Sequence, residues 1–439
     1  MDDLSLKQLL TEPRTIEDLH IPQNIVIDLI FRLLYNEGNV ALARFTEVLK
    51  ISRNIIDEIL LWMQKEHLVE VSKATVEMGR LGNVYTLTDA GQERARSAFE
   101  RSQYVGPLPV AIPYYNRGIE LQTKVRSKVS IEQVRSSLTH LVLPPEFHRQ
   151  IGPAINSGSS IFLYGPPGNG KTTIAMAIAK LIAGTDPIWV PYAITAGGQI
   201  IQIHDRLVHK QVPVESGRTA ELGRVDQRWS LVERPAVSVG GELKMDALDL
   251  RYDPISKFYE APLQLKANGG MFLIDDFGRQ QIKPSDLLNR WIVPLESRID
   301  YLRLLSGQTI VVPFRQLIVF STNLDPAELV DDAFLRRIQM KVSVVSPDEK
   351  LYFQIFAIMA KELNIPFNKD AFLYLIQKWY RETGRKYQAV HPRDLLRIII
   401  ALCEYEGSQP RITPDLIDEA CHSYFVDSPV GRKSLGISQ

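Results

Sequence analysis

The chain has 439 residues, which is more than a single hydrophobic core usually supports, so two or three domains are expected. Hydrophobic residues make up 45% and charged residues 23%, as in ordinary globular proteins. The 51 basic residues balance the 51 acidic ones, which excludes a general electrostatic attraction to nucleic acid or to anionic membranes.

Cysteine usage and the first residues predict the compartment. Only Cys403 and Cys421 occur in this long chain, which indicates a reducing environment. The acidic N-terminus does not resemble a signal peptide, and apolar runs fall short of the roughly 20 residues of a membrane span. We therefore expect a cytoplasmic protein. His204 and His209 lack partners at metal-ligand spacing, so no zinc site is expected.

Residues 1–105 are predicted to form a separate small domain. Helical periodicity covers residues 21–35, a short segment at 41–50 follows, and Ser52 then begins a strong helix. Strands are expected at 68–71 and 84–87, and Thr88 begins a last helix that ends near residue 102. This order of three helices, a two-stranded wing and a closing helix resembles that of winged-helix domains.

The charge of this segment bears on its partner. Residues 1–105 hold 12 basic and 16 acidic residues, a net charge of −4. The helix at 52–67, in the position of a recognition helix, carries two basic and three acidic residues, which would repel phosphate. The segment is therefore interpreted as a protein-docking module, with DNA binding as the alternative. Three prolines between Pro107 and Pro113 predict a linker after it, over residues 106–129.

The most informative motif is Gly-Pro-Pro-Gly-Asn-Gly-Lys-Thr at residues 165–172, which fits the phosphate-loop pattern G-x-x-x-x-G-K-[ST]. A buried-strand run at 160–164 precedes it and an Ala-rich helical run at 172–182 follows it, so its backbone N–H groups gather at a helix N-terminus. Lys171 would reach the β- and γ-phosphates, and Thr172 would ligate Mg²⁺. The predicted nucleotide-binding residues are Gly165, Pro166, Pro167, Gly168, Asn169, Gly170, Lys171, Thr172 and Thr173.

Two carboxylates complete the predicted site. Asp275 and Asp276 end an apolar strand at 271–274, and open α/β sheets bind ligands at the carboxyl ends of their strands. Asp275 would hold the metal, and Asp276 would polarise the attacking water. From residue 130 onward strands alternate with helices, which predicts a parallel sheet with flanking helices. Helical segments at 348–363, 369–383, 392–406 and 413–425 predict a helical lid.

With these motifs, residues 130–428 resemble the AAA+ ATPases. The resemblance implies an α/β phosphate-loop module, ATP and Mg²⁺ as cofactors, and ATP bound between the subunits of a homo-oligomeric ring, expected to be a hexamer. In that family the second acidic residue is usually Glu, so the shorter Asp276 predicts slower turnover or a shared role. The predicted domains are 1–105, the 106–129 linker, the 130–346 nucleotide-binding domain, the 347–428 lid and a 429–439 tail.

Further matches follow in the order that the resemblance requires. Asn323, after the strand run at 317–322, corresponds to sensor 1 and would bind the attacking water or the γ-phosphate. Arg336 and Arg337 correspond to the arginine-finger segment, in which Arg337 fits the finger better and the other arginine could pair with an interface acid. Arg393 corresponds to sensor 2 and would close the lid onto the γ-phosphate. A surface ion pair with the neighbouring Asp is the alternative for Arg393.

Two insertions in the nucleotide-binding domain indicate which branch of the AAA+ ATPases the chain resembles. Extended runs on both sides of Gly240 and Gly241 predict a β-hairpin. The resemblance implies that an insertion here contacts substrate in a central pore, and a hairpin that only decorates the surface is the alternative. The aromatic residues after it, Tyr252, Phe258 and Tyr259, would grip a threaded chain or pack in the core. Residues 300–313 predict a second hairpin, an arrangement that resembles the MoxR-type chaperones and the bacterial enhancer-binding ATPases.

These predictions combine into one function with two alternatives. The expected function is chaperone-like remodelling of protein assemblies by an ATP-hydrolysing ring, with a protein client bound through the N-terminal domain and the pore hairpins. The first alternative is a DNA-associated ATPase, either a transcription activator or a helicase loader. The second is a nucleotide-gated scaffold with little turnover, because Asp276 replaces the usual Glu.

Overall fold

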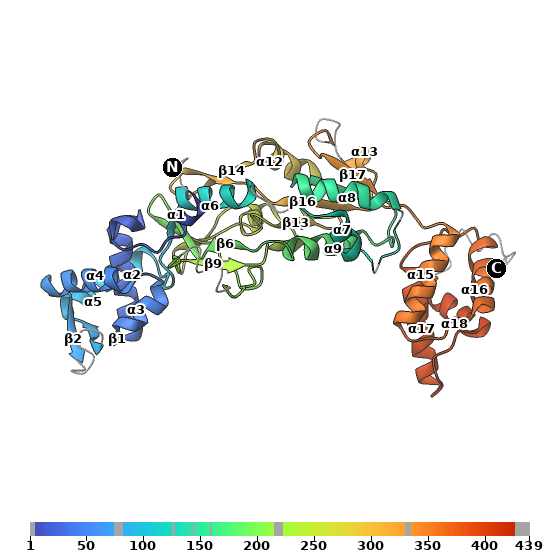
Figure 1. Ribbon diagram of the computed structural model, residues 1–439, viewed down its shortest axis with the longest axis horizontal. Coiled ribbons are helices and arrows are strands. Elements are labelled where there is room, and N and C mark those ends of the chain that lie inside the picture. Colours follow the sequence, from blue (N-terminus) through green and yellow to red (C-terminus); the bar gives the residue numbers. More distant parts are fainter. Residues whose placement is uncertain are drawn as a thin grey trace.

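The computed structural model describes residues 5–73, 82–124, 128–139, 141–143, 145–158, 160–214, 223–329 and 335–425. Along the chain these residues form an N-terminal helical unit, a central α/β unit and a C-terminal helical unit, which follow one another from one end of the molecule to the other (Figure 1). Among the helices of these residues, none combines the length and the apolar character needed to cross a bilayer. The predicted tail, 429–439, lies outside the described residues.

The N-terminal unit packs helices and a small antiparallel sheet around one core. Periodic apolar residues such as Leu29, Phe45 and Ile56 are fully buried there. Thr88 caps its last helix, since the Thr88 Oγ1 accepts the N–H of Gly91 at 3.1 Å. The elements are α2 (Gln23–Glu37), β1 (Val40–Ala41), α3 (Leu42–Leu49), α4 (Arg53–Lys65), β2 (Val69–Lys73), β3 (Val84–Leu87) and α5 (Asp89–Arg101), with strand order β1-β3-β2.

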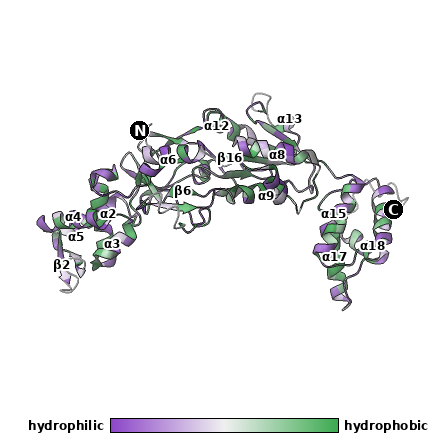
Figure 2. Ribbon diagram, in the orientation of Figure 1, coloured by the Kyte–Doolittle hydropathy of each residue, from purple (hydrophilic) through white to green (hydrophobic). Residues whose placement is uncertain are grey.

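The central unit contains the predicted parallel sheet with helices on both faces. Among the described residues its order is β10 (Ala236–Val239), β13 (Met271–Ile274), β16 (Leu317–Thr322), β5 (Ser160–Tyr164) and β17 (Met340–Ser343), and all neighbours are parallel. Helices α7 (Ile131–Ser137), α8 (Pro145–Ser157) and α9 (Lys171–Ala183) pack on one face, and α12 (Pro284–Ser297) packs on the other. The three inner strands, β13, β16 and β5, are buried almost throughout because helices cover both faces of the sheet, whereas the edge strands β10 and β17 expose alternate residues. Figure 2 shows hydrophobic residues along β16 and α9.

The hairpin predicted around Gly240 and Gly241 is wrong. The run before the two glycines is β10, which pairs in parallel with β13 as the edge strand of the central sheet. The residues after them form a short 3-10 helix, Met245–Leu248. Neither described glycine has the left-handed backbone that a two-residue hairpin turn requires. One of the two hairpins proposed to contact a client is therefore a structural strand.

The linker predicted over residues 106–129 is also wrong, because much of it is folded. Strand β4 (Val110–Ala111) joins a second sheet, and α6 (Ile112–Lys124) buries Tyr115 and Ile119 against that sheet. Pro113 lies in the first turn of α6, where a missing N–H breaks no helical hydrogen bond. The order of this sheet is β11 (Arg251–Asp253), β12 (Phe258–Glu260), β8 (Gln199–Gln202), β7 (Ala193–Ala196) and β4.

Smaller elements complete the central unit. The second predicted hairpin is confirmed as the antiparallel pair β14 (Ile299–Arg303) and β15 (Thr309–Pro313). Of the three aromatic residues that were predicted to grip a chain or pack in the core, Tyr259 is buried, while Tyr252 and Phe258 are half-buried against core residues. Further elements among the described residues are α1 (Leu6–Leu9), the 3-10 helix Glu17–Leu19, the antiparallel pair β6 (Ile188–Pro191) and β9 (Trp229–Val232), α11 (Leu263–Lys266) and α13 (Pro326–Leu329).

Beside the second sheet, the buried His209 is held in its neutral form. Its Nδ1 accepts the N–H of Asp205 at 2.9 Å, and its Nε2 lies 3.0 Å from the carbonyl oxygen of Lys266, so the proton is on Nε2. Burial lowers the pKa of His209 from 6.5 to about 4. As the pH falls, the unfolded chain takes up this proton before the folded one. The contribution of neutral His209 to the free energy of unfolding is therefore complete above about pH 6.5 and is lost progressively towards about pH 4.

We expect this histidine to make the protein acid-labile. From His209 alone, the free energy of unfolding should be about 1 kcal/mol lower at about pH 5.5 than at about pH 7. Urea unfolding at the two pH values measures this difference. The His209→Gln variant should lose less stability, because an amide can accept from Asp205 and donate to Lys266 without titrating. Equal losses in the two proteins would contradict the assignment.

The C-terminal unit is helical, as predicted. Its helices are α15 (Glu349–Glu362), α16 (Lys369–Leu375), which continues as a π-helical segment over Ile376–Arg381, α17 (His391–Tyr405) and α18 (Pro414–Tyr424). They share a core that includes Tyr352, Phe372 and both buried, free cysteines. Residues 344–348 connect β17 to α15, so the chain enters this unit directly from the edge of the central sheet.

Candidate functional site

The phosphate loop joins the end of β5 to the start of α9, as predicted. Gly165, Gly168 and Gly170 have φ angles of 138°, 74° and 86°, which residues with side chains rarely adopt. A Cβ atom at Gly165 would lie 2.3 Å from the carbonyl oxygen of Val344, so this position also lacks space for a side chain. The loop therefore curls at the N-terminus of α9, where backbone N–H groups and the helix dipole favour an anion.

Lys171 is folded back onto the loop. Its Nζ donates to the carbonyl oxygens of Gly165 and Pro166, each at 2.8 Å, and the residue is 6% exposed. Burial lowers the pKa of Lys171, while the nearby carboxylates of Asp276 and Asp275 act in the opposite direction. A partly desolvated ammonium group at the centre of an anion-binding loop is a strong donor to phosphate oxygens.

Polar side chains from neighbouring segments meet next to this loop. The Thr172 hydroxyl donates to Oδ2 of Asp275 at 2.8 Å, and Nδ2 of Asn323 donates to Oδ1 of Asp276 at 3.1 Å. The two aspartates follow β13, Asn323 follows the adjacent β16, and Thr172 follows β5, which is next to β16. The carboxyl ends of three neighbouring parallel strands thus bring the four predicted residues together.

The oxygens of Thr172 and Asp275 suit Mg²⁺. Both residues line the same cavity, and Mg²⁺ usually takes one or two protein oxygens and completes its shell with water and phosphate. Asp276 has a left-handed backbone, with φ of 49°, and its N–H donates to Oδ1 of Asp275 at 3.1 Å. This backbone turns Asp276 away from the pair and towards Asn323, which suits a role in orienting water.

Other polar contacts that hold the two aspartates were missed in the sequence. Nε2 of Gln280 donates to the carbonyl oxygens of Asp275 and Asp276, at 2.8 and 3.1 Å. The Thr322 hydroxyl donates to the carbonyl oxygen of Phe277 at 2.7 Å. These residues fix the backbone after β13 across two strands. A glutamine in a turn and a threonine at the end of a strand are common, so neither gives a signal in the sequence.

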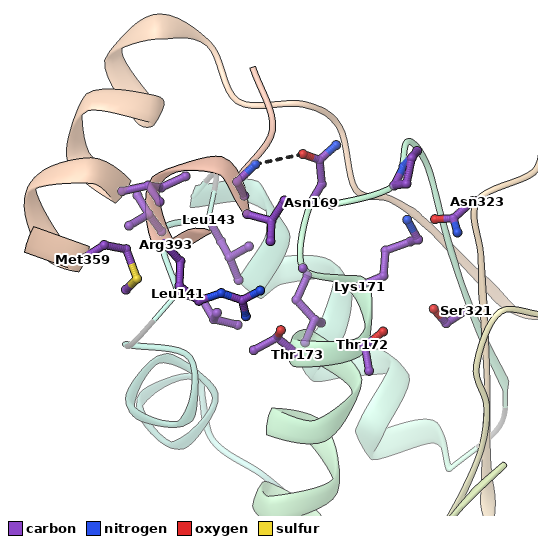
Figure 3. A pocket seen from close by; sticks show the side chains of 18 of the residues that line it. Leu141, Leu143, Asn169, Lys171, Thr172, Thr173, Ser321, Asn323, Met359 and Arg393 are labelled. Carbon is purple, nitrogen blue, oxygen red and sulfur yellow. Dashed lines mark hydrogen bonds between the residues drawn. The ribbon is translucent and has the colours of Figure 1, made fainter. Parts of the chain in front are cut away.

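A cavity of about 500 Å³ lies between the phosphate loop and the C-terminal unit (Figure 3). Its polar end contains Lys171 together with Thr172, Asp275, Asp276 and Asn323. Its other end is largely apolar, and Figure 3 shows Leu141, Leu143 and Met359 separated from Lys171 and Asn323 by Thr173. A nucleoside triphosphate has the same two parts, an aromatic base and a chain of charged phosphates. The apolar lining at this end includes Leu141, Val142, Leu143, Ile355, Ile358, Met359 and Val390.

Arg393 lines this cavity from the first turn of α17. Its Nε also donates to Oδ1 of the neighbouring Asp394 at 2.9 Å, and the hydroxyl of Tyr424 donates to the other oxygen of that carboxylate at 3.0 Å. The ion pair that was the alternative is therefore present, while Arg393 also lines the cavity, and its role as sensor 2 stays a prediction. Figure 3 shows its guanidinium group near Leu141 and Thr173.

Arg336 and Arg337 are not among the described residues that line this cavity. Nε of Arg337 donates to Oε1 of Glu296, near the end of α12, at 2.6 Å, which makes an ion pair within the chain. Arg337 is half-buried, whereas Arg336 is exposed. Residues 332–334 of the predicted finger segment lie outside the described residues.

The structure thus gathers most of the predicted site in one place. Gly165 and Pro166 belong to the loop and bind Lys171, but they are not among the described lining residues. The predicted residues that line the cavity are Pro167, Gly168, Asn169, Gly170, Lys171, Thr172, Thr173, Asp275, Asp276, Asn323 and Arg393.

The site combines a phosphate loop and paired carboxylates at the edge of a parallel sheet. Proteins described as AAA ATPases are similar in sequence to this chain. A protein of Corynebacterium jeikeium, described as an AAA ATPase forming ring-shaped complexes, is 25% identical over 243 residues, which is 55% of this chain and 37% of the relative. A protein of Corynebacterium urealyticum with the same description is 43% identical over 53 residues, 12% of this chain and 10% of the relative. The chain therefore spans only a minor part of each relative. These similarities support an AAA+ ATPase.

Other comparisons cover the C-terminal unit and the overall fold. The family described as Domain of unknown function (DUF8689) matches residues 348–423. The solved structure of NtrX from Brucella abortus in complex with ADP is 15% identical, with a TM-score of 0.39 over 80% of this chain and 70% of that one. The RuvB Holliday junction branch migration motor of Thermotoga maritima is 16% identical, with a TM-score of 0.35 over 68% and 71%.

Proposed function

We propose that this chain binds ATP with Mg²⁺ in the cavity and hydrolyses it as an AAA+ ATPase. The observation that carries the proposal is the hydrogen-bonded set of Thr172, Asp275, Asp276 and Asn323 beside the phosphate loop. Thr172 and Asp275 would hold the metal, which neutralises charge on the phosphates, while Asp276 and Asn323 would orient the attacking water. Phosphate release with Mg²⁺ and after chelation tests this proposal, and equal rates would contradict it.

We also propose that the active form is a homo-oligomeric ring, with a hexamer as the expected size. The two Corynebacterium relatives are described as forming ring-shaped complexes. Arg337 forms an ion pair with Glu296 and is not among the described residues of its own cavity, which suits a guanidinium group that completes the site of a neighbouring subunit. Arg336, one residue earlier and exposed, is the alternative finger.

Mixing two inactive variants tests whether the arginine acts between subunits. Arg337→Ala should lower the hydrolysis rate on the order of 10³-fold, and Asp276→Asn should also be inactive. A site that combines the loop of an Arg337→Ala subunit with the arginine of an Asp276→Asn subunit contains every group. An equal mixture should therefore recover about a quarter of wild-type phosphate release, since random assembly gives each site that chance.

The mixing experiment has two controls. Each variant alone at the total protein concentration of the mixture should remain inactive. Arg336→Ala in place of Arg337→Ala identifies which of the two arginines crosses the boundary. A mixture with Arg337→Ala that stays inactive, although an affinity tag on one variant recovers the other in the same ring, would contradict action between subunits.

We propose that the ring remodels protein assemblies and that the N-terminal unit, as a winged-helix-like domain, docks a protein rather than DNA. Helix α4, in the position of a recognition helix, exposes Glu58 and Trp62, which is 41% exposed, and the exposed Glu66 follows it, so the exposed Arg53 and Lys65 of the helix bring no net positive charge. Carboxylates repel DNA phosphates, whereas an exposed tryptophan suits a protein interface. The β14–β15 hairpin, whose Leu305 is 73% exposed, is the remaining candidate for client contact, and membership of the MoxR-type branch stays a prediction based on that hairpin.

One measurement distinguishes a protein-docking N-terminal unit from the DNA-associated alternative. ATP hydrolysis is followed with and without duplex DNA at low and at physiological salt. Docking of a protein predicts no stimulation by DNA. Strong stimulation that fades with salt would favour the alternative, because phosphate contacts release counterions.

The buried, free thiols of Cys403 and Cys421 suit a reducing compartment, and on this basis we propose a cytoplasmic location.

A further inference from the structure

Asn169 belongs to the phosphate loop, but its side-chain amide is bound by the C-terminal unit. The residue is 5% exposed. Its Oδ1 accepts the N–H of Ala389 at 3.2 Å, which is the contact drawn in Figure 3. Its Nδ2 donates to the Ser346 hydroxyl at 3.2 Å. One buried amide thus connects the loop to two segments that lie 177 and 220 positions later in the chain.

These two segments lie at the start of the C-terminal unit and next to its helix α17. Ser346 is in the connection from β17 to α15, where the chain enters that unit. Ala389 lies two residues before α17, whose first turn carries Arg393. The contact uses both halves of the amide, an acceptor towards Ala389 and a donor towards Ser346. An aliphatic side chain at this position would provide neither.

The neighbouring glycine makes the same connection through the backbone. The N–H of Val390 donates to the carbonyl oxygen of Gly168 at 2.8 Å. A Cβ atom at Gly168 would lie 2.6 Å from Oε1 of Gln388 and 2.8 Å from Cγ1 of Val390. Close packing of the C-terminal unit therefore accounts for a glycine at this position of the loop, in addition to its φ of 74°.

We infer that Asn169 is a positioning residue that couples the phosphate loop to the C-terminal unit and so sets the position of Arg393 according to the nucleotide bound. This inference rests on the proposed nucleotide function. Phosphates in the loop adjust the backbone at residues 168–169, and the bonds to Ala389, Val390 and Ser346 carry that change to the start of α17. Without the amide, nucleotide still binds through the loop, but the C-terminal unit no longer responds to it.

The test measures a distance between the two units in the full chain. Spin labels at Met176→Cys in α9 and Tyr405→Cys in α17 occupy exposed positions, at 45% and 93% exposure, while the native cysteines are buried. Distances are recorded by electron paramagnetic resonance without nucleotide, with MgADP and with a non-hydrolysable ATP analogue. We expect nucleotide to change the distance in the otherwise native chain and to leave it unchanged in Asn169→Ala.

Affinity and two further variants separate coupling from binding and from a loss of stability. Asn169 was predicted to bind nucleotide, but its side-chain amide binds Ser346 and Ala389, so its own contribution to phosphate binding would come from the backbone N–H. Alanine keeps that N–H, and the Kd of Asn169→Ala for ADP should therefore rise by less than about tenfold. Ser346→Ala removes one of the two bonds from outside the loop and should give a smaller distance change than the native residue. Asn156→Ala is the matched control, because that amide also makes two bonds, to the main chain of Val129 at 2.8 and 3.1 Å, away from the cavity lining.

The possible results have distinct meanings. A normal nucleotide-dependent distance change in Asn169→Ala would overturn the coupling while leaving the proposed ATPase intact. Loss of ADP binding in a folded Asn169→Ala protein would also overturn it, because the residue would then be a binding group. If the native chain binds no nucleotide, the proposed function fails and the coupling fails with it.

Discussion

Lys171→Ala is expected to raise the Kd for ATP at least about 100-fold, which corresponds to about 3 kcal/mol of binding free energy. Lys171 is 6% exposed, and its ammonium group donates to the carbonyl oxygens of Gly165 and Pro166. In the complex it would exchange those neutral acceptors for phosphate oxygens, and charge-assisted hydrogen bonds of this kind are about twice as strong as neutral ones. Alanine removes the only side-chain cation that the described loop, residues 165–172, contributes to the phosphates.

Titration of the variant with a fluorescent ATP analogue measures this loss. Lys180→Ala is the matched control, because Lys180 lies in the same helix, α9, and is exposed. The control should bind ATP like the wild-type protein and should also show the same thermal unfolding. Normal hydrolysis of ATP by Lys171→Ala would show that the phosphate loop is not the site.

Asp276→Asn is expected to retain ATP binding and to lower the single-turnover hydrolysis rate by about 10² to 10³-fold, the usual contribution of a positioned base. The substitution is conservative in structure. Asparagine tolerates the left-handed backbone at this position, where φ is 49°, and its side-chain oxygen can still accept from Nδ2 of Asn323. The loss therefore reports the carboxylate charge itself rather than a change in fold.

Rapid mixing followed by acid quench measures the chemical step of this variant. Asp286→Asn, at an exposed position in the first turn of α12, is the control and should hydrolyse ATP normally. The same experiment on the wild-type protein examines the scaffold alternative. A wild-type chain that binds ATP but turns over no faster than Asp276→Asn would be a nucleotide-gated scaffold, and Asp276 would then have no catalytic role.

Much of the site could be predicted from sequence because its chemistry is local. The glycines, Lys171 and Thr172 lie within eight consecutive residues, between an apolar strand and an Ala-rich helix. Asp275, Asp276 and Asn323 each follow a buried, largely apolar strand, and adjacent parallel strands end at the same edge of the sheet. The sequence shows where each of these strands ends, so the polar residues that follow the strands can be placed at one edge of the sheet.

Pairing between distant segments was not predictable, and the wrong predictions come from it. The run at 236–239 alternates in the same way whether it folds into a hairpin or joins a sheet edge, and only its contact with β13 decides between the two. The prolines near residue 110 suggest a spacer, yet the extended backbone that they favour also suits strand β4. Local composition predicts that a segment is extended, but it does not predict which other strand that segment pairs with.

Three features could be predicted from the order of residues alone: a phosphate loop before a helix, two carboxylates at the end of a buried strand, and helices after the sheet. Only the tertiary structure decided that Asn169 contacts Ala389 across 220 positions, that Arg337 pairs with Glu296, and that apolar residues from distant segments form one end of the cavity. The physical reason is that backbone conformation and burial patterns depend on neighbours along the chain. Contacts between side chains depend on where whole elements pack, which no short stretch of sequence encodes.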